Sequence, residues 1–340
     1  MMRRRWLNIL AVSLTMVGCC ALGGCEFAKT SSSSESNSLA SEPDDGLGTQ
    51  YVLNNDGQGY TILAAGQDAN ETVWNVPSIY KGLPVTAIGD FAASMSKCTK
   101  VVLPDTITTI GTWAFMDCPN LKSIDLGNGV TTIGERAFGN CGNLTSIAIP
   151  DSVTTMGGLL FYECRNLTDV TIGKNVTAIE AFAFQNCTQL QSIKIPDSVT
   201  SIGECAFTSC TSLSSVEFGV GVTSIGYGAF SFCESLTSIA IPDGVTVIND
   251  HTFACCRNLT SVVLHDGITS MEGSDTVTEC YKLENIYYKG TEESWTEKPW
   301  KDLLIGGTWN ALDDLTRYYY SETEQSGCWH YDENGQPVLW

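Results

Sequence analysis

Hydrophobic and polar positions recur along this chain with a period of 23 residues. Seven consecutive segments run from Val101 to Ser261, and each places a phenylalanine and, six residues later, a leucine at the same positions. One segment of this length cannot bury its own hydrophobic face, so the pattern predicts a solenoid whose neighbouring coils cover one another. The recurring residues are Phe115, Phe138, Phe161, Phe184, Phe207, Phe230 and Phe253, with Leu121, Leu144, Leu167, Leu190, Leu213, Leu236 and Leu259.

Each segment predicts the same order of elements. Ile124 and Leu126 alternate with Asp125, which is the period of a short strand with one buried face. Residues 130–133 predict a second strand, and the apolar spacing in residues 137–144 suits a helical or 3-10 turn. Proline, which fixes φ, and glycine, which permits positive φ, alternate at the corner between the strands. These corner residues are Pro104, Pro150, Pro196 and Pro242, with Gly127, Gly173 and Gly219 in the alternate segments.

The repeated pattern IxIPxxVTxIGxxAFxxCxxLxS resembles the BspA-type leucine-rich repeats, also described as the Treponema pallidum type. The resemblance covers about residues 83–290. It implies a predominantly β fold with short helical or 3-10 turns: a right-handed leucine-rich repeat solenoid, capped at both ends. It also implies host matrix proteins, such as fibronectin, or other cells as ligands.

The N-terminus predicts export. Residues 1–25 hold three arginines, an apolar stretch and small residues, as in a secretory signal. Leu22-Gly23-Gly24-Cys25 resembles a bacterial lipobox, which implies a lipid on Cys25 and an anchor on the extracellular face of the cell membrane. Met16–Cys19 is a weaker second candidate, and an ordinary cleaved signal without a lipid is the alternative. Residues 26–48 are rich in serine and predict a flexible tether.

The two ends of the repeat array predict caps, because a solenoid has to cover its open apolar ends. Residues 49–82 predict an N-terminal β cap that begins with a hairpin turning at Asp56-Gly57, and residues 83–285 form the solenoid. Residues 286–340 predict an aromatic cap, in which residues 286–295 resemble the closing segment of BspA-type arrays. The cap contains Trp295, Trp300, Trp309, Trp329 and Trp340.

Charge removes one class of partner. The net charge is −20 and the pI about 4.3, so the surface repels nucleic acid. We therefore expect no nucleic-acid partner. Separately, we expect the protein to be a monomer.

Cysteine spacing argues against the disulfides that fifteen cysteines in an exported protein would normally suggest. Eight cysteines stand one per segment, so their Cβ vectors would be parallel and each thiol would have two equivalent neighbours. We interpret them as free buried thiols that fill small apolar spaces, with disulfides or a metal as alternatives. Cys205, Cys255 and Cys328 lie off this column and are either exposed and reactive or buried. The column is Cys118, Cys141, Cys164, Cys187, Cys210, Cys233, Cys256 and Cys280.

Catalytic chemistry is not indicated. The sequence contains no phosphate-binding loop, HExxH, calcium-loop or GxSxG motif, so we predict no catalytic residue, cofactor or metal ligand and no enzyme activity. His251 and His265 lie in neighbouring segments at different positions of the coil. A column of threonines predicts a structural hydroxyl ladder, with recognition of a regular lattice as the alternative. Aspartates follow the four corner prolines, too far apart to share a calcium ion, and predict corner hydrogen bonds.

Function is expected where the repeat varies outward. The position between the two aliphatic residues of the first strand and the position two before the phenylalanine both vary between segments, although the second is expected to be partly buried. Varied chemistry on a rigid sheet suits a non-catalytic interaction module or adhesin, with a host matrix protein or another surface protein as its partner. The alternative is a cell-wall or polysaccharide-binding accessory protein that uses the C-terminal tryptophans; residues 328–340 faintly resemble one choline-binding wall repeat. The candidate partner-binding residues are Asp125, Thr171, Lys194, Glu217, Trp113 and Arg136.

Overall fold

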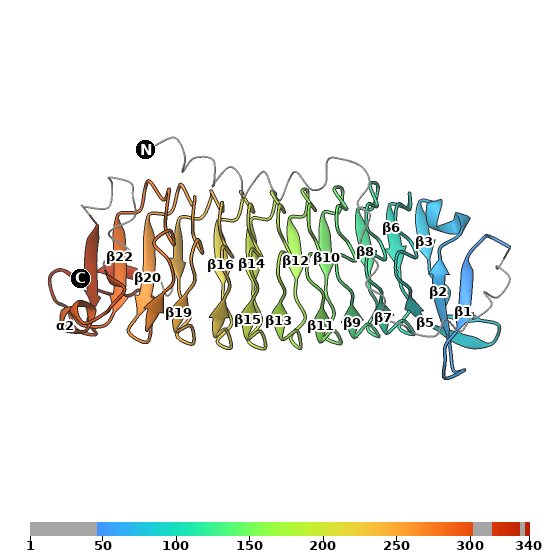
Figure 1. Cartoon of the computed structure of the whole chain (residues 1–340), viewed down its shortest axis with the longest axis horizontal. Helices are drawn as coiled ribbons and strands as arrows, with labels where there is room; N and C mark the ends of the chain where they lie inside the picture. The colour runs from blue at the N-terminus through green and yellow to red at the C-terminus, as the bar shows by residue number, and fades with distance from the viewer. Residues whose placement is uncertain (1–45, 302–314, 334–336) are drawn as a thin grey trace. The chain divides into compact units, whose positions relative to one another are not determined.

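A computed structural model describes residues 46–301, 315–333 and 337–340, which stack as coils of a β-solenoid (Figure 1). The coils number about ten and repeat about every 23 residues, as the sequence predicts. The signal segment, the lipobox with Cys25 and most of the tether lie outside the described residues, as does Trp309. None of the described helices is both long and apolar enough to cross a membrane.

Each coil contributes two short strands, which stack in two separate columns (Figure 1). The first column comprises β3 (Val73–Asn75), β6 (Lys100–Val102), β8 (Ser123–Asp125), β10 (Ser146–Ala148), β12 (Asp169–Thr171), β14 (Ser192–Lys194), β16 (Ser215–Glu217), β18 (Ser238–Ala240), β20 (Ser261–His265) and β22 (Asn285–Lys289). The second comprises β5 (Leu83–Ile88), β7 (Thr109–Ile110), β9 (Thr132–Ile133), β11 (Thr155–Met156), β13 (Ala178–Ile179), β15 (Ser201–Ile202), β17 (Ser224–Ile225), β19 (Val247–Ile248) and β21 (Ser270–Met271).

The strands of most successive coils pair in parallel with the register of the repeat. Hydrogen-bonded pairing is interrupted between β12 and β14 and between β16 and β18 in the first column, and between β11 and β13 and between β17 and β19 in the second, although these strands remain in contact. In the first column Ile147 pairs with Val170, and in the second Ile110 pairs with Ile133. Every repeat position therefore lies beside its own equivalent in the next coil. This alignment turns a recurring residue type into a continuous column.

The phenylalanine column is the centre of the core. Its seven side chains are buried, and neighbouring rings stack with centroids 5.1 to 6.0 Å apart and planes within 26° of parallel. The leucine column is buried beside it. The prediction that both columns form the core is confirmed.

The segment that contains the phenylalanine forms tight turns, and the described repeats contain no helix there. The reason is a pair of left-handed residues in each turn, such as Arg136 at φ 53° and Asn140 at φ 57°, which a right-handed helix does not accommodate. Alternate amides then point to the next coil: Arg136 N donates to Gly158 O at 2.9 Å and Phe138 N to Leu160 O at 3.1 Å. The turn is held by its neighbour, like the strands.

The cysteine column supplies hydrogen-bond donors as well as filling space. The Cys187 thiol donates to the carbonyl of Phe161 at 3.2 Å, and the Cys164 thiol donates to Phe138 at 3.1 Å; the same contact recurs along the column. All twelve described cysteines are free, and those in the column are buried. Cys205 and Cys255 are buried as well, whereas Cys328 is half-buried.

Threonines and aspartates join successive coils at the surface. The hydroxyl of Thr131 donates to the carbonyl of Thr108 at 3.1 Å, and this contact recurs at most positions of the threonine column. The corner carboxylate of Asp105 accepts the amide of Asn128, one coil on, at 2.7 Å, and the carboxylates of Asp151 and Asp197 accept the equivalent amides. The structural role predicted for both sets is confirmed.

Only one of the three corner glycines needs positive φ. Gly127 has φ 63°, whereas Gly173 and Gly219 are not among the positive-φ residues. At Gly173 an added Cβ would lie 2.3 Å from the carbonyl oxygen of Pro150. Glycine is needed there because the backbone of the preceding coil passes too close for a side chain, which corrects the expectation based on φ alone.

The N-terminal cap is the predicted hairpin, β1 (Gln50–Leu53) paired antiparallel with β2 (Tyr60–Ala64). It is followed by the 3-10 helix η2 (Gln67–Asn70) and by β4 (Ile79–Tyr80), and the Tyr51 and Tyr80 rings stack 3.8 Å apart. The predicted cap, residues 49–82, also includes β3, which already pairs with β6 in the register of the repeat. The stack of first strands thus begins before residue 83.

The C-terminal cap extends the stack beyond residue 285. Strand β23 (Thr316–Tyr320) pairs in parallel with β22, β24 (Cys328–Tyr331) pairs in parallel with β23, and β25 (Pro337–Leu339) returns antiparallel. The short helix α2 (Glu292–Thr296) starts with a capping box at Thr291 and Ser294. Trp295 within it and the nearby Trp300 are buried, with rings edge to face at 5.4 Å.

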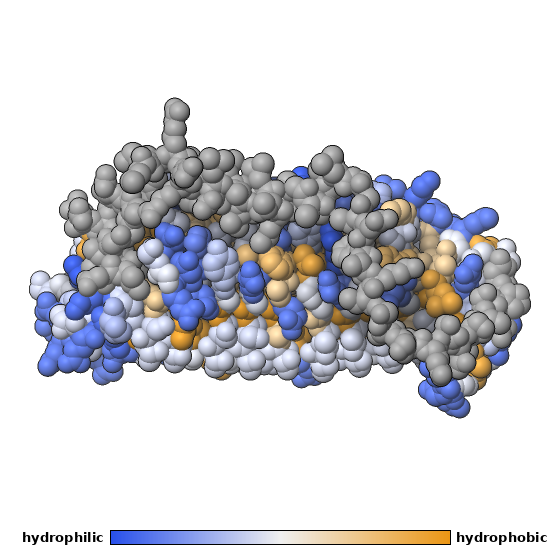
Figure 2. Space-filling view, in the orientation of Figure 1, coloured by the Kyte–Doolittle hydropathy of each residue, from blue (hydrophilic) through white to orange (hydrophobic). Residues whose placement is uncertain are grey.

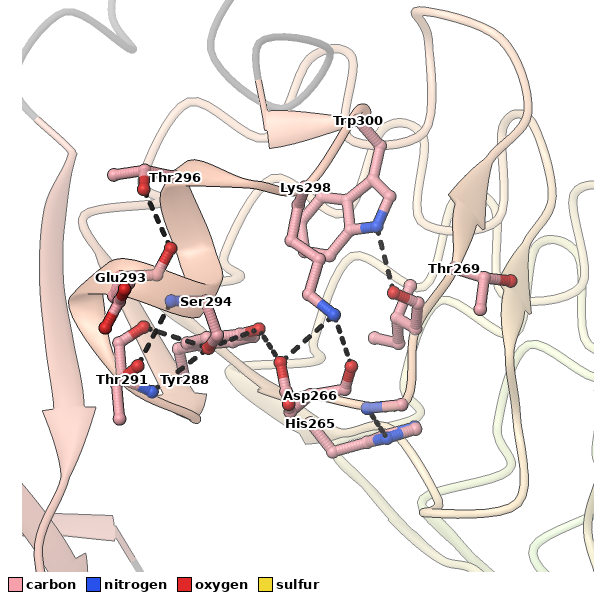
Figure 3. Close-up of polar contacts among 12 residues, drawn as sticks. His265, Asp266, Thr269, Tyr288, Thr291, Glu293, Ser294, Thr296, Lys298 and Trp300 are labelled. Atoms are coloured by element: carbon pink, nitrogen blue, oxygen red, sulfur yellow. Dashed lines mark hydrogen bonds and ion pairs between the residues drawn. The ribbon is translucent and has the colours of Figure 1, made fainter.

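Asp266 joins this cap to the last coil (Figure 3). Tyr288 donates its hydroxyl hydrogen bond to the Asp266 carboxylate, and Lys298 Nζ lies 3.0 Å from the same carboxylate. These two partners hold the pKa of Asp266 below its usual value, while burial and then Asp266 raise the pKa of Tyr288. Trp300 Nε1 donates to the carbonyl of Ile268 at 3.1 Å, so the cap is fixed by several specific contacts.

The buried thiols predict a loss of stability in alkali. A thiol ionises near pH 9.0 when unperturbed, but burial raises the pKa of Cys164 and Cys210 to about 12. Because the pKa of these thiols is higher in the folded than in the unfolded chain, each thiol stabilises the fold fully below pH 9. This stabilisation is lost between pH 9 and 12. The free energy of unfolding then falls by up to about 1.4 kcal/mol per pH unit for each thiol. Urea unfolding followed by circular dichroism should show this fall, and it should be shallower in a Cys164→Ala/Cys210→Ala variant. Equal slopes for both proteins would contradict this origin.

Candidate partner-binding surface

Four of the six predicted residues lie on the outer side of the first strand column. Asp125, Thr171, Lys194 and Glu217 are each the last residue of their strand, and all four are exposed. Their inward neighbours lie at the core, as at Ile124 in β8 and Ile193 in β14. We call these four, with Ala148 and Ala240 at the equivalent positions, the outer strand column.

Charge is arranged locally within this column. Lys194 and Glu217 are directly paired across β14 and β16, and their side chains form an ion pair. The hydrogen bond from Lys194 to Glu217 raises the pKa of the lysine. Both side chains are more than 60% exposed, so the pair contributes little to stability and is open to a partner.

Small residues in the column leave space between charged ones. An open hollow of about 460 Å³ lies over β6, β8 and β10, lined by Lys100, Asp125, Asn128, Ala148 and Pro150 among others. The methyl group of Ala148 leaves room beside Asp125 for a side chain from another molecule. On the side shown in Figure 2, a hydrophobic band runs along the coils beside a band of intermediate hydropathy, as expected when equal positions are stacked.

The other two predicted residues belong to a different part of the coil. Trp113 and Arg136 lie in the turn after the second strand, and both have left-handed backbones, with φ 57° and 53°. Each is half-buried, and Trp113 Nε1 and Arg136 Nε are shielded from solvent without a hydrogen-bond partner. The six predicted residues therefore fall into two groups on different elements, and the partial burial expected for the second group is confirmed.

The turn positions pack against neighbours that the repeat pattern did not single out. Trp113 meets Phe91 edge to face at 4.5 Å, and the Arg136 guanidinium lies 4.9 Å from the centre of the Tyr162 ring. Phe91 stands at the equivalent position in the shortened first turn, and its side chain is 52% exposed. The equivalence of Phe91 and Trp113 was available from the alignment of the segments, but their contact required the stacked structure.

The C-terminal tryptophans offer little exposed ring surface in the described residues. Trp295, Trp300 and Trp329 are buried, and Trp329 Nε1 donates to the carbonyl of Tyr288 at 3.1 Å. Trp340 is partly exposed and lies against His330 with ring centroids 3.6 Å apart. Three of these four side chains are thus part of the cap core.

Comparison with known proteins assigns the repeat. The family model described as the BspA type leucine rich repeat region matches residues 86–200 and 177–302, in six copies. The chain belongs to the BspA-type leucine-rich repeat family. Both this repeat family and the solenoid fold are typically non-catalytic.

Solved structures with related chains include bacterial leucine-rich repeat proteins. A leucine rich cell surface protein from Faecalibacterium prausnitzii is 26% identical, over 77% of this chain and 98% of its own, with a TM-score of 0.36. The Treponema pallidum leucine rich repeat protein is 26% identical, over 71% and 90%, with a TM-score of 0.36. The pneumococcal vaccine antigen PcpA is 15% identical, over 84% and 94%, with a TM-score of 0.43. A comparison with curated proteins gives no match.

In this BspA-type solenoid, substitutions in the two groups of candidate residues should lower the free energy of unfolding by different amounts. Lys194→Ala removes an exposed ion pair and should change the free energy of unfolding by no more than about 0.5 kcal/mol. Trp113→Ala removes a half-buried ring and its contact with Phe91, and should cost about 1–3 kcal/mol. Urea unfolding of the two variants measures the difference, and equal costs would contradict the division into a free strand column and a packed turn.

Proposed function

We propose that this BspA-type protein is a surface-displayed, non-catalytic interaction module that binds another extracellular protein through the outer strand column. One observation carries the proposal: the column is exposed and chemically varied, while the backbone of each strand is fixed by parallel pairing with a neighbouring coil. A partner meets preorganised side chains, which reduces the entropy lost on binding. Host matrix proteins and other surface proteins are the partner class that the family suggests.

Display at the surface is part of the same proposal. A lipid on Cys25 anchors the chain, and residues 26–48 hold the solenoid away from the membrane. A Cys25→Ser variant should lose both fatty-acid labelling and membrane association. Retention of both would place the anchor elsewhere, with Cys19 as the next candidate.

The Lys194–Glu217 ion pair provides the substitutions that test whether the outer strand column binds the partner. The swap Lys194→Glu/Glu217→Lys keeps the net charge, the ion pair and the exposure of both positions while reversing the pattern that a partner meets. A control away from the column is Arg257→Glu/Glu234→Arg, which swaps another pair with a nitrogen–oxygen distance of 3.3 Å. Arg257 also lies 3.5 Å from Glu279, so the control swap should unfold somewhat earlier than the parent, whereas the outer-column swap should keep the parent's unfolding midpoint. Binding is compared under conditions in which both variants are folded.

Binding should be measured against immobilised matrix proteins, including fibronectin, and against extracellular proteins of neighbouring cells. We expect the outer-column swap to weaken binding at least about tenfold, because like charges then face each other across the interface, while the control swap binds as the parent does. A partner that binds both swaps equally would contradict the outer column as the binding surface. The absence of any protein partner in a broad panel would contradict the interaction module.

A carbohydrate-binding role is the competing class, and Trp340 is the side chain that tests it. Trp329 is unsuitable because its ring is buried and its loss would damage the cap. A Trp340→Ala variant that keeps its fold and loses association with isolated cell walls would favour the competing role. Unchanged wall association would leave the described C-terminal tryptophans as capping residues.

A further inference from the structure

The coil formed by residues 262–285 is one residue longer than the preceding coils. Its turn places Asp275 beside Asp250 and His251 of the preceding coil. One potential ligand atom from each of these three side chains lies within 4.8 Å of the others. Among the described residues, these three form the one group of at least three histidine, cysteine or acidic side chains that is close enough to hold a metal ion.

The contact between Asp250 and His251 has the spacing of two ligands rather than the direction of a hydrogen bond. His251 Nδ1 lies 2.9 Å from Asp250 Oδ2, yet Nδ1 is shielded from solvent and has no hydrogen-bond partner of acceptable geometry. Two ligands that each lie about 2.1 Å from a transition-metal ion are separated by about 3 Å at a right angle and by about 3.4 Å at a tetrahedral angle. The observed distance of 2.9 Å lies near the short end of this range.

The backbone of the longer coil is shaped around the Asp250 carboxylate. Gly273 has φ 81°, and an added Cβ would lie 2.2 to 2.6 Å from the carboxylate atoms of Asp250. The amide of Asp275 donates to Asp250 Oδ1 at 3.1 Å, which leaves Oδ2 toward His251. Glycine and this amide together fix the direction in which Asp250 presents its free oxygen.

Within the described part of the chain, no lysine or arginine pairs with the carboxylates of Asp250 and Asp275. Among the described ion pairs, Asp250 pairs with His251 alone, and none joins Asp275 to a lysine or arginine. The Tyr227 ring lies 5.2 Å from the His251 ring.

We propose that Asp250, His251 and Asp275 bind one divalent transition-metal ion of the zinc class, through Nδ1 of the histidine and one oxygen of each carboxylate. An imidazole ligand favours such ions over calcium and magnesium, which prefer all-oxygen sites. All three residues are half-buried, so water completes the coordination. Because the ligands come from two successive coils, the ion ties the longer coil to the regular stack.

Zinc binding to the untagged, chelator-treated full chain tests the proposal by isothermal titration and by the shift in unfolding temperature. We expect one ion per chain and a higher unfolding temperature. His251→Ala and Asp275→Asn should each weaken binding at least about tenfold. No uptake, equal uptake by these variants, or calcium binding as tight as zinc binding would overturn the proposal.

A matched control and a spectroscopic readout separate this site from the rest of the chain. Asp90 makes a similar corner contact, accepting the Thr112 amide at 2.8 Å, so Asp90→Asn should leave zinc binding unchanged. Cobalt in place of zinc should show the weak visible bands of nitrogen and oxygen ligation. Strong near-ultraviolet charge transfer from thiolate to cobalt would instead place the ion on the cysteines and overturn the proposal.

Discussion

The contact between one coil and the next is the interaction on which the rest of the structure depends. Parallel pairing in a fixed register places each residue beside its own equivalent, so phenylalanines stack on phenylalanines at 5.1 to 6.0 Å. The same alignment lets each column thiol donate to the preceding coil and alternate turn amides donate to the following one. Stability is then a sum over neighbouring coils, and each end needs a cap.

This constraint separates structural positions from those available for function. Phenylalanine, leucine, cysteine and threonine columns are used in joining coils, and the corner aspartates are used in the same way. The outer strand column is the exposed part of the first strand, and its residues vary between charged, small and polar side chains. The longer coil at residues 262–285 departs from the repeat, and it contributes Asp275 to the proposed metal site.

Periodicity predicted the core columns, because these depend on residue spacing alone, and the Asp56-Gly57 turn signal predicted the N-terminal hairpin. It did not predict the left-handed turn residues, since Trp113, Arg136 and Leu159 share no side-chain chemistry that requires positive φ. The donor role of the thiols and the burial of Trp329 depend on directions that spacing does not define. Asp250, His251 and Asp275 were overlooked because the extra residue shifts Asp275 out of its expected alignment with His251.

Thiol labelling under native conditions, located by peptide mass spectrometry, tests the central claim most directly because almost every coil carries one column cysteine. If coil-to-coil packing holds the molecule together, the column cysteines from Cys118 to Cys280 should stay unlabelled until urea unfolds the solenoid, while the half-buried Cys328 reacts first. Labelling of several column cysteines in native buffer, or their recovery as disulfides, would contradict the account.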